Sequence, residues 1–202
     1  GNSMQVIDMD RSGINVEKLE ASGAEIAYVM PSHQYPLGTV MPIKRRLELL
    51  KWADGSERRY IVEDDYDSEF RYKGKPIPAL QGYDSHGKVI YIGTFSKSIA
   101  PAIRVSYLVL PEKLLRLYEE RGTAFSSTVS RVDQRIVAGF LKEGYYERHL
   151  NKMRAVYKSR HDVLLDGLKE IPDIEVSGEN AGVHLLVRFR NGKTEAEACA
   201  QA

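Results

Sequence analysis

The feature that most constrains this chain is a short apolar run that leads into a lysine among hydroxyl residues. Residues 89–92 have the composition of a buried strand, Gly93 follows them, and Lys97 lies between Ser96 and Ser98. A lysine is costly to bury without a partner or a chemical role. Open α/β sheets place their ligand sites just beyond the carboxyl ends of their strands. A lysine held partly out of water loses its proton more easily and can form a Schiff base with an aldehyde. We therefore expect a partly desolvated Lys97 that acts in this way.

Further polar residues in the same stretch suit a phosphate group. Thr94 and Ser96 supply hydroxyl groups, and Arg104 follows the lysine by seven residues. A guanidinium is a fork-shaped cation that can make two parallel hydrogen bonds to a phosphate. A Schiff-base lysine beside a phosphate site indicates pyridoxal phosphate (PLP) as the cofactor. We expect Thr94, Ser96, Lys97 and Arg104 to bind it, with Lys97 as the catalytic residue.

A second apolar strand ends in acidic residues and supplies what the rest of this cofactor needs. If residues 59–66 stay extended, Asp64 and Tyr66 point to one face of the strand. A carboxylate beside the pyridine nitrogen keeps it protonated, so that the ring can act as an electron sink. We expect Asp64 to pair with that nitrogen and Tyr66 to bond the ring oxygen.

The same acids allow a different interpretation, in which they bind Mg²⁺ as in a nucleotide hydrolase. That interpretation requires a G-x-x-x-x-G-K-[ST] loop elsewhere in the sequence. The stretch 93–98 reads GTFSKS, with no glycine before the lysine and too short a loop. The sequence therefore favours the cofactor over a metal, and we expect no metal site.

Taken together, these motifs resemble the aminotransferase-like domain of the MocR/GabR group of bacterial transcription regulators. The resemblance rests on PSHQYPLG at 31–38, IVEDDYDSEF at 61–70, and GTFSKS at 93–98 with Arg104. EGYYERHL at 143–150, with Met153 and Arg154, is also typical of the group. These regulators are similar to class I/II, fold-type I aminotransferases that follow a GntR-type winged-helix DNA-binding domain. The resemblance covers nearly all of the chain.

The resemblance implies an α/β fold in two parts. Residues 1–145 would form part of the PLP-binding large domain, a mostly parallel sheet flanked by helices. Residues 146–202 would form a long linking helix and the start of a small α+β domain. The winged helix, the rest of the phosphate-binding turn and the family's substrate-carboxylate arginine would lie outside this chain. The chain is then expected to be the middle of a longer, dimeric protein.

Two functions fit the Lys97 site. One is the effector-sensing domain of a GntR/MocR-family regulator, in which an amine or amino acid reacts with PLP held on Lys97 and DNA is bound only through the winged helix. The other is a working aminotransferase that acts on an amino acid or amine. The motifs PSHQYP at 31–36 and EGYYERH at 143–149 favour the regulator. A third possibility is an interaction module that binds no cofactor.

The amino-acid composition limits the partners and the cellular compartment to be expected for the protein. The 29 basic and 28 acidic residues give a net charge of +1, which argues against a chain built mainly to grip nucleic acid. The single cysteine, Cys199, excludes an internal disulfide framework and fits a reducing cytoplasm. No apolar run approaches the ~20 residues that span a bilayer. We expect a cytoplasmic protein.

The loop at 31–42 departs from ordinary aminotransferases, because Tyr35 stands where the family carries the asparagine that bonds the cofactor's ring oxygen. The Tyr35-Pro36 bond is a candidate for the cis form. His33 would either touch the cofactor or be a loop histidine satisfied by backbone. The basic cluster at 44–46 would be a solvated face of a helix over 42–53. Strands are expected at 24–30, 105–110 and 182–189, the first two of them buried, and helices at 129–142 and 147–171.

Overall fold

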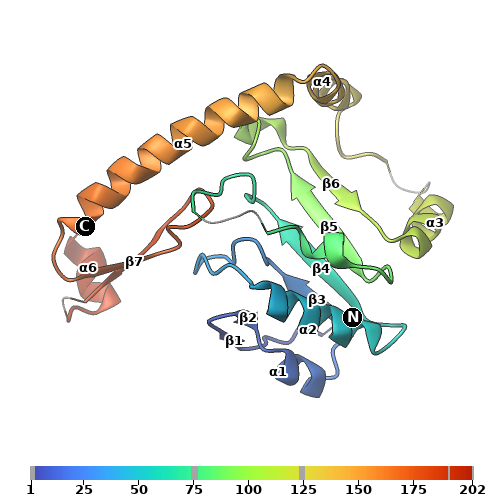
Figure 1. Ribbon diagram of the computed structural model, residues 1–202, viewed down its shortest axis with the longest axis horizontal. Helices are drawn as coiled ribbons and strands as arrows, with labels where there is room; N and C mark the ends of the chain where they lie inside the picture. The colour runs from blue at the N-terminus through green and yellow to red at the C-terminus, as the bar shows by residue number, and fades with distance from the viewer. Residues whose placement is uncertain (1–2, 74–76, 123–125, 191, 202) are drawn as a thin grey trace.

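A four-stranded mixed sheet forms the centre of the computed structural model, which describes residues 3–73, 77–122, 126–190 and 192–201 (Figure 1). Its strand order is β3 (Ile26–Val29), β4 (Tyr60–Asp65), β5 (Val89–Thr94) and β6 (Ser106–Val109). The first three strands are parallel, and β6 adds to β5 in the antiparallel direction. The prediction of a mostly parallel α/β sheet with flanking helices is confirmed.

Helices flank this sheet and lead away from it. The bounds are α1 (Val16–Ala21), α2 (Ile43–Asp54), α3 (Glu112–Arg121), α4 (Arg131–Lys142), α5 (Tyr145–Lys169) and α6 (Glu195–Gln201). Two 3₁₀ helices are η1 (Leu80–Tyr83) and η2 (Pro101–Ile103). Helix α5 runs from the sheet to a small hairpin made of β7 (Ile174–Ser177) and β8 (Leu186–Phe189), as Figure 1 shows. The sequence predicted β8 within 182–189 but missed β7. A third ladder, β1 (Met9–Asp10) with β2 (Gly13–Ile14), lies near the N-terminus.

One face of the sheet carries the core. Along β4 the side chains alternate between buried and half-buried positions, as a strand with one covered face requires. The buried side packs against α1 and α2, and α2 contributes buried side chains from its inner stripe. The core cluster comprises Ile14, Leu19, Ala27, Val29, Met41, Leu49, Leu50, Trp52, Ala53, Ile61, Leu80 and Val89.

The other face is more open. Ile26 and Tyr28 of β3 are 60% and 55% exposed, and Leu108 of β6 is 55% exposed. All four residues of β6 are exposed. The predictions of buried strands at 24–30 and 105–110 are therefore right about the strands. They are wrong about full burial, because β3 and β6 are the two edge strands of this sheet: β3 is buried on one side only and β6 is exposed throughout.

Arg46 is the largest fully buried side chain of the chain's described part. Its three guanidinium nitrogens donate to the carbonyl oxygens of Met41 (3.1 Å), Pro78 (2.8 Å) and Pro31 (3.0 Å). The prediction of a solvated basic face at 44–46 is wrong here, since Arg46 faces the core while Lys44 is exposed. Nearby residues of a helix point to different sides, so Arg46 reaches the interior while Lys44 faces solvent.

The charge of Arg46 is matched from β4. Glu63 is also fully buried, and its Oε1 lies 3.9 Å from Arg46 Nη1. The Glu63 carboxylate accepts hydrogen bonds from the backbone N–H groups of Leu80 and Gln81, both at 2.8 Å. Burial lowers the pKa of Arg46, which Glu63 partly offsets, and raises the pKa of Glu63, which the two N–H donors partly offset.

We predict that Arg46→Met destabilises the fold by about 3–5 kcal/mol, because it leaves the Glu63 charge buried without its partner. Urea unfolding followed by circular dichroism measures this. Lys44→Met, on the same helix but exposed, is the matched control and should change stability by less than about 0.5 kcal/mol. Equal effects of the two variants would contradict a special role for the buried pair.

Candidate active site

The predicted site residues gather where β4 and β5 end. The two strands are parallel neighbours, with Asp64 beside Ile92 and Asp65 beside Gly93. Their carboxyl ends therefore open at the same edge of the sheet, the position at which such sheets bind ligands. A side chain on Gly93 would come within 2.2 Å of the Tyr107 ring from β6. Glycine is thus what allows β6 to pack beside the last residues of β5.

Lys97 lies in the turn that follows β5. Phe95 starts this turn by donating its N–H to the Val105 carbonyl (2.9 Å), and Ile99 N–H bonds the Phe95 carbonyl (2.9 Å). The Lys97 side chain is exposed, and within the described residues no hydrogen bond or ion pair to it is recorded. The expected partial desolvation is therefore not found in this chain, because the turn that carries Lys97 lies at the surface.

The predicted phosphate contacts are brought together in the same turn. Arg104 Nη1 donates to Ser96 Oγ at 3.3 Å. Thr94 Oγ1 accepts the Ser96 backbone N–H (3.2 Å) and donates to the Val105 carbonyl (3.4 Å). The hydroxyl of Thr94 therefore shapes the turn, whereas Ser96 and the exposed Arg104 present a hydroxyl and a guanidinium side by side. That pair of donors suits a phosphate.

Arg104 adopts a backbone conformation that arginine rarely takes. It follows η2 with φ 50° and ψ 36°, in the left-handed region. That region costs an L-residue roughly 1–2 kcal/mol relative to glycine. Strained positions of this kind cluster at functional sites, and in this conformation the Arg104 side chain reaches Ser96.

We predict that Arg104→Gly keeps or raises stability, by up to about 1 kcal/mol, because glycine removes the strain and one exposed hydrogen bond contributes little. Arg104→Ala keeps the strained conformation and should be no more stable than the wild type. Thermal unfolding of the three proteins checks this. A marked destabilisation by Arg104→Gly would mean that the arginine itself holds the turn together.

Asp64 and Tyr66 lie on the less buried side of β4, as predicted. Asp64 and Tyr66 are half-buried, whereas Glu63, Asp65 and Asp67 between and around them are buried. The Tyr28 hydroxyl of β3 donates to Asp64 Oδ2. Burial, and then the bond to Asp64, raise the pKa of Tyr28 to about 12. Tyr28 thus fixes one oxygen of Asp64 from the neighbouring strand, a contact that sequence reasoning missed.

Tyr66 turns toward the loop at 31–42. Its hydroxyl donates to the His33 carbonyl (2.8 Å) and lies 3.2 Å from His33 Nδ1. Burial, and then the nearby Asp67 charge, raise the pKa of Tyr66 above its ordinary value. The phenol is therefore held protonated at neutral pH, as a hydrogen-bond donor.

The remaining acids of this run are engaged one by one. Asp65 accepts from the Tyr91 hydroxyl (2.7 Å) and the Ser68 hydroxyl (2.6 Å). Asp67 pairs with His33, with 3.0 Å between Oδ2 and Nδ1. Glu63, Asp64, Asp65 and Asp67 therefore each have a partner of their own, which differs from the shared cation site considered as an alternative.

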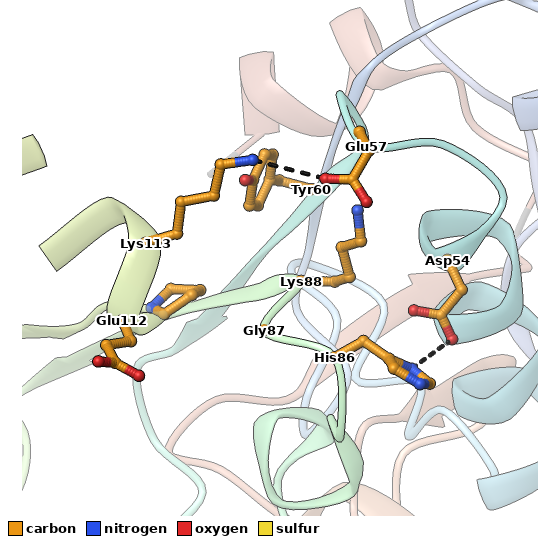
Figure 2. A pocket seen from close by; sticks show the side chains of 9 residues that line it. Asp54, Glu57, Tyr60, His86, Gly87, Lys88, Glu112 and Lys113 are labelled. Atoms are coloured by element: carbon orange, nitrogen blue, oxygen red, sulfur yellow. Dashed lines mark hydrogen bonds and ion pairs between the residues drawn. The ribbon is translucent and has the colours of Figure 1, made fainter. Parts of the chain in front are cut away.

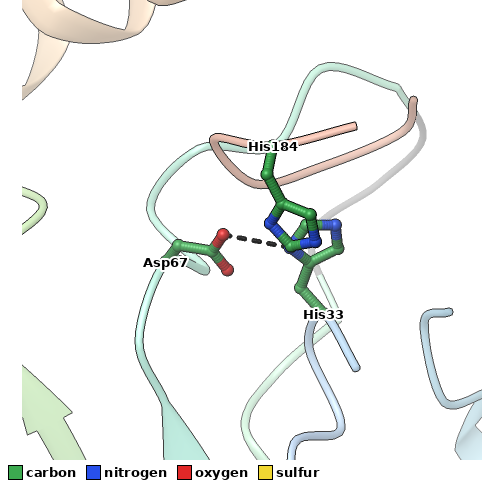
Figure 3. A group of neighbouring side chains, drawn as sticks. All are labelled: His33, Asp67 and His184. Carbon is green, nitrogen blue, oxygen red and sulfur yellow. Dashed lines mark hydrogen bonds and ion pairs between the residues drawn. The ribbon is translucent and has the colours of Figure 1, made fainter. Parts of the chain in front are cut away.

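His33 is not the loop histidine satisfied by backbone that was one of the two alternatives from sequence. It is 2% exposed and is held by a side chain, Asp67, rather than by backbone alone. The Tyr35-Pro36 bond beside it is cis, as predicted. His184, which precedes β8, lies against the same ring, with 4.5 Å between the ring centroids (Figure 3). No local pattern could have indicated that contact, because 151 residues separate the two histidines (184 minus 33).

A cavity lies elsewhere. It has a volume of about 510 Å³ and is lined from the end of α2, the segment before β5 and the start of α3, including Asp54, Glu57, His86 and Lys113 (Figure 2). Its charged groups pair with one another: Lys113 with Glu57 at 3.5 Å, and His86 with Asp54 at 3.1 Å. It contains none of the predicted site residues, so we do not assign it to the cofactor.

Comparison with known proteins identifies the fold and the family of this chain. The family model for aminotransferase class I and II matches residues 4–202. The multiple substrate aminotransferase from Thermococcus profundus superposes with a TM-score of 0.83 at 30% identity, covering 96% of this chain and 51% of that one. The chain therefore belongs to the class I and II aminotransferase family, whose cofactor is pyridoxal phosphate.

Regulators of the predicted kind are among the relatives. An uncharacterised HTH-type transcriptional regulator of Bacillus subtilis, YdeL, is 43% identical over 90% of this chain and 39% of its own length. The probable rhizopine catabolism regulatory protein MocR of Rhizobium meliloti is 35% identical over 94% of this chain and 38% of its own length. The resemblance to MocR-type regulators is thus confirmed. The chain spans about two fifths of these relatives and about half of the solved aminotransferase.

In the described part of the chain, no helix has the length and apolar character needed to cross a membrane.

Proposed function

We propose that this chain is the PLP-binding, effector-sensing domain of a GntR/MocR-family transcription regulator, with the cofactor held on Lys97. The observation that carries the proposal is that Asp64 lies at the end of β4, while Lys97 and the Ser96–Arg104 pair lie in the segment that follows the neighbouring parallel strand β5. The regulators among its relatives support the same function. The protein would work as a cytoplasmic homodimer and reach DNA through a separate winged-helix domain.

The residues at the strand ends fit the groups of the cofactor. Ser96 Oγ and the Arg104 guanidinium are 3.3 Å apart and would hold the phosphate, with Thr94 shaping the turn between them. The Asp64 carboxylate, fixed by Tyr28, would face the pyridine nitrogen, and the protonated Tyr66 hydroxyl would face the ring oxygen. When bound, PLP supplies an electron sink for an attached amine.

Lys97 would have two tasks in this site. Its Nζ would hold the cofactor covalently through the aldehyde carbon. After an incoming amine displaces it, the same Nζ would take and return a proton as general base and acid. The exposure of Lys97 leaves it accessible to both cofactor and amine. Further walls from the rest of the protein, or from a partner subunit, would desolvate it.

The two-part division of the chain belongs to the same proposal. Residues 1–145 would be part of the large domain, and α5 would link it to the start of a small domain at 146–202. The packing of the β7–β8 hairpin near His33 would then be a contact between the two domains.

A working aminotransferase is the second candidate, because the solved relative at 30% identity is such an enzyme. The chemistry of Lys97 serves both functions. What separates them is whether the amine is converted to a carbonyl product and released, or is retained and changes DNA binding.

We predict that borohydride reduction of the PLP-treated chain leaves a pyridoxyl group on Lys97, found by peptide mass spectrometry. Lys97→Ala should abolish this adduct, and Lys51→Ala, which removes an exposed lysine of α2, should not. Adducts spread evenly over surface lysines, in this chain and in the complete protein alike, would sink the assignment of Lys97.

We further predict that, in the complete protein, an amino compound that shifts the visible absorbance of bound PLP also changes affinity for operator DNA. Lys97→Ala should remove both responses, because both require the amine to react at this site. Gel-shift titration and product analysis for a 2-oxo acid measure the two outcomes. Multiple turnovers with no change in DNA binding would favour the enzyme instead.

A further inference from the structure

A buried cluster joins the loop at 31–42 to the segment after β4 and to the hairpin. His33 and Asp67 are 2% and 1% exposed, and His184, just before β8, packs against His33 with its ring tilted by 42° (Figure 3). Tyr66 touches the cluster through its hydroxyl, 3.2 Å from His33 Nδ1. The cluster therefore lies directly behind one of the groups proposed to contact the cofactor.

The hydrogen bonds fix which nitrogen of His33 carries the proton. Asp67 Oδ2 lies 3.0 Å from His33 Nδ1 and also accepts the Val183 N–H at 3.2 Å. An ionised carboxylate only accepts, so Nδ1 is the donor. The other nitrogen, Nε2, is buried and has no hydrogen-bond partner among the residues that the structure describes. A hydrogen on Nε2 would have no acceptor among these residues, so the hydrogen bonds favour Nδ1 as the nitrogen that carries the donated hydrogen.

Glycine residues hold this ring in one place. A Cβ on Gly182 would lie 2.1 Å from His33 ring atoms, and one on Gly38 would lie 2.2 Å from the Cα of Gly178. The hairpin backbone therefore closes onto the ring with no room for side chains. His184 completes the contact by hydrogen-bonding the Pro36 carbonyl through Nε2 (3.1 Å).

We propose that His33 is a positioning residue for Tyr66: Asp67 and the hairpin fix His33, and His33 fixes the phenol that faces the cofactor's ring oxygen. This inference rests on the proposed function for the identity of the cofactor. The Tyr66 hydroxyl is held by the carbonyl of His33 (2.8 Å) as well as by its ring. Docking of the hairpin therefore sets the place of a cofactor contact through a single residue.

The same three residues have the donor types of a metal site. One donor atom from each of His33, Asp67 and His184 lies within 4.8 Å of the others. A bound ion would have to replace the hydrogen bond between His33 and Asp67. The contacts present in the cluster are hydrogen bonds. The test below distinguishes them from metal binding.

The test is a double-mutant cycle on PLP affinity with His33→Phe and Tyr66→Phe. His33→Phe keeps a ring in the space but removes the Nδ1 donor, and a lost hydrogen bond should weaken binding about 3- to 10-fold. Because His33 acts through Tyr66, the double variant should bind no more weakly than Tyr66→Phe alone. His33→Asn, whose amide nitrogen replaces Nδ1, should recover part of the loss. The control His86→Phe removes an exposed histidine elsewhere and should have no effect.

A second readout needs no cofactor. In the PLP-free protein with ring-labelled tyrosine, the Tyr66 phenol signal, assigned with Tyr66→Phe, should shift its titration midpoint by about half a pH unit or more in His33→Phe. An unchanged titration, or equal losses from His33→Phe with and without Tyr66, would overturn the positioning role. Stoichiometric Zn²⁺ on the purified protein, lost in Asp67→Asn, would also overturn it in favour of a metal site. A wild type that forms no Lys97 adduct but shows the Tyr66 shift would refute the proposed function and leave this inference standing.

Discussion

The buried pair of Arg46 and Glu63 is the interaction on which the rest of this structure depends. Arg46 binds the carbonyl of Pro31, where the loop at 31–42 begins, and that of Pro78 before η1. Glu63 lies in β4 immediately before Asp64 and caps the backbone of η1. The Arg46–Glu63 pair thus fixes the start of the loop at 31–42, the position of β4, and the segment with η1 that connects β4 to β5. Removing a charge from water is costly unless it is fully hydrogen-bonded, and these contacts satisfy both ends.

That constraint explains how the site is built from distant pieces. The loop brings His33 to Tyr66, the strand brings Asp64 beside β5, and the turn after β5 brings Ser96 to Arg104. Of these contacts, only the one between Ser96 and Arg104 joins residues that are close in the sequence. Its geometry comes from short backbone and side-chain bonds, including the left-handed conformation at Arg104, and so it depends little on the rest of the fold.

Features set by residues close together in the sequence could be predicted, whereas features set by contacts between distant residues could not. Residues 89–92 and 60–65 were recognisable as strands because apolar composition reflects local burial. The strand-end site residues followed, since their positions are set by the strands. Arg46 was misjudged because a basic cluster on a helix reads as solvated, and nothing local reveals a buried acid 17 residues away (63 minus 46). The burial of β6 and Lys97 was misjudged because exposure depends on what covers a surface, which no strand pattern encodes.

The contacts around Asp64 and Tyr66 suggest how such a site could pass on information. The two proposed contacts to the cofactor's ring are each supported by one residue from a different element: Asp64 by Tyr28 of β3, and Tyr66 by His33 of the loop. The first support is part of the rigid sheet, whereas the second is clamped by the hairpin through Asp67 and His184. A ligand that changes the contact at the ring oxygen would therefore act on the hairpin, while the contact at the pyridine nitrogen stays fixed to the sheet. In the proposed sensing domain this asymmetry would let the hairpin side respond to a ligand while the sheet side stays fixed, since a ligand shifts an equilibrium only through its different contacts in the two states.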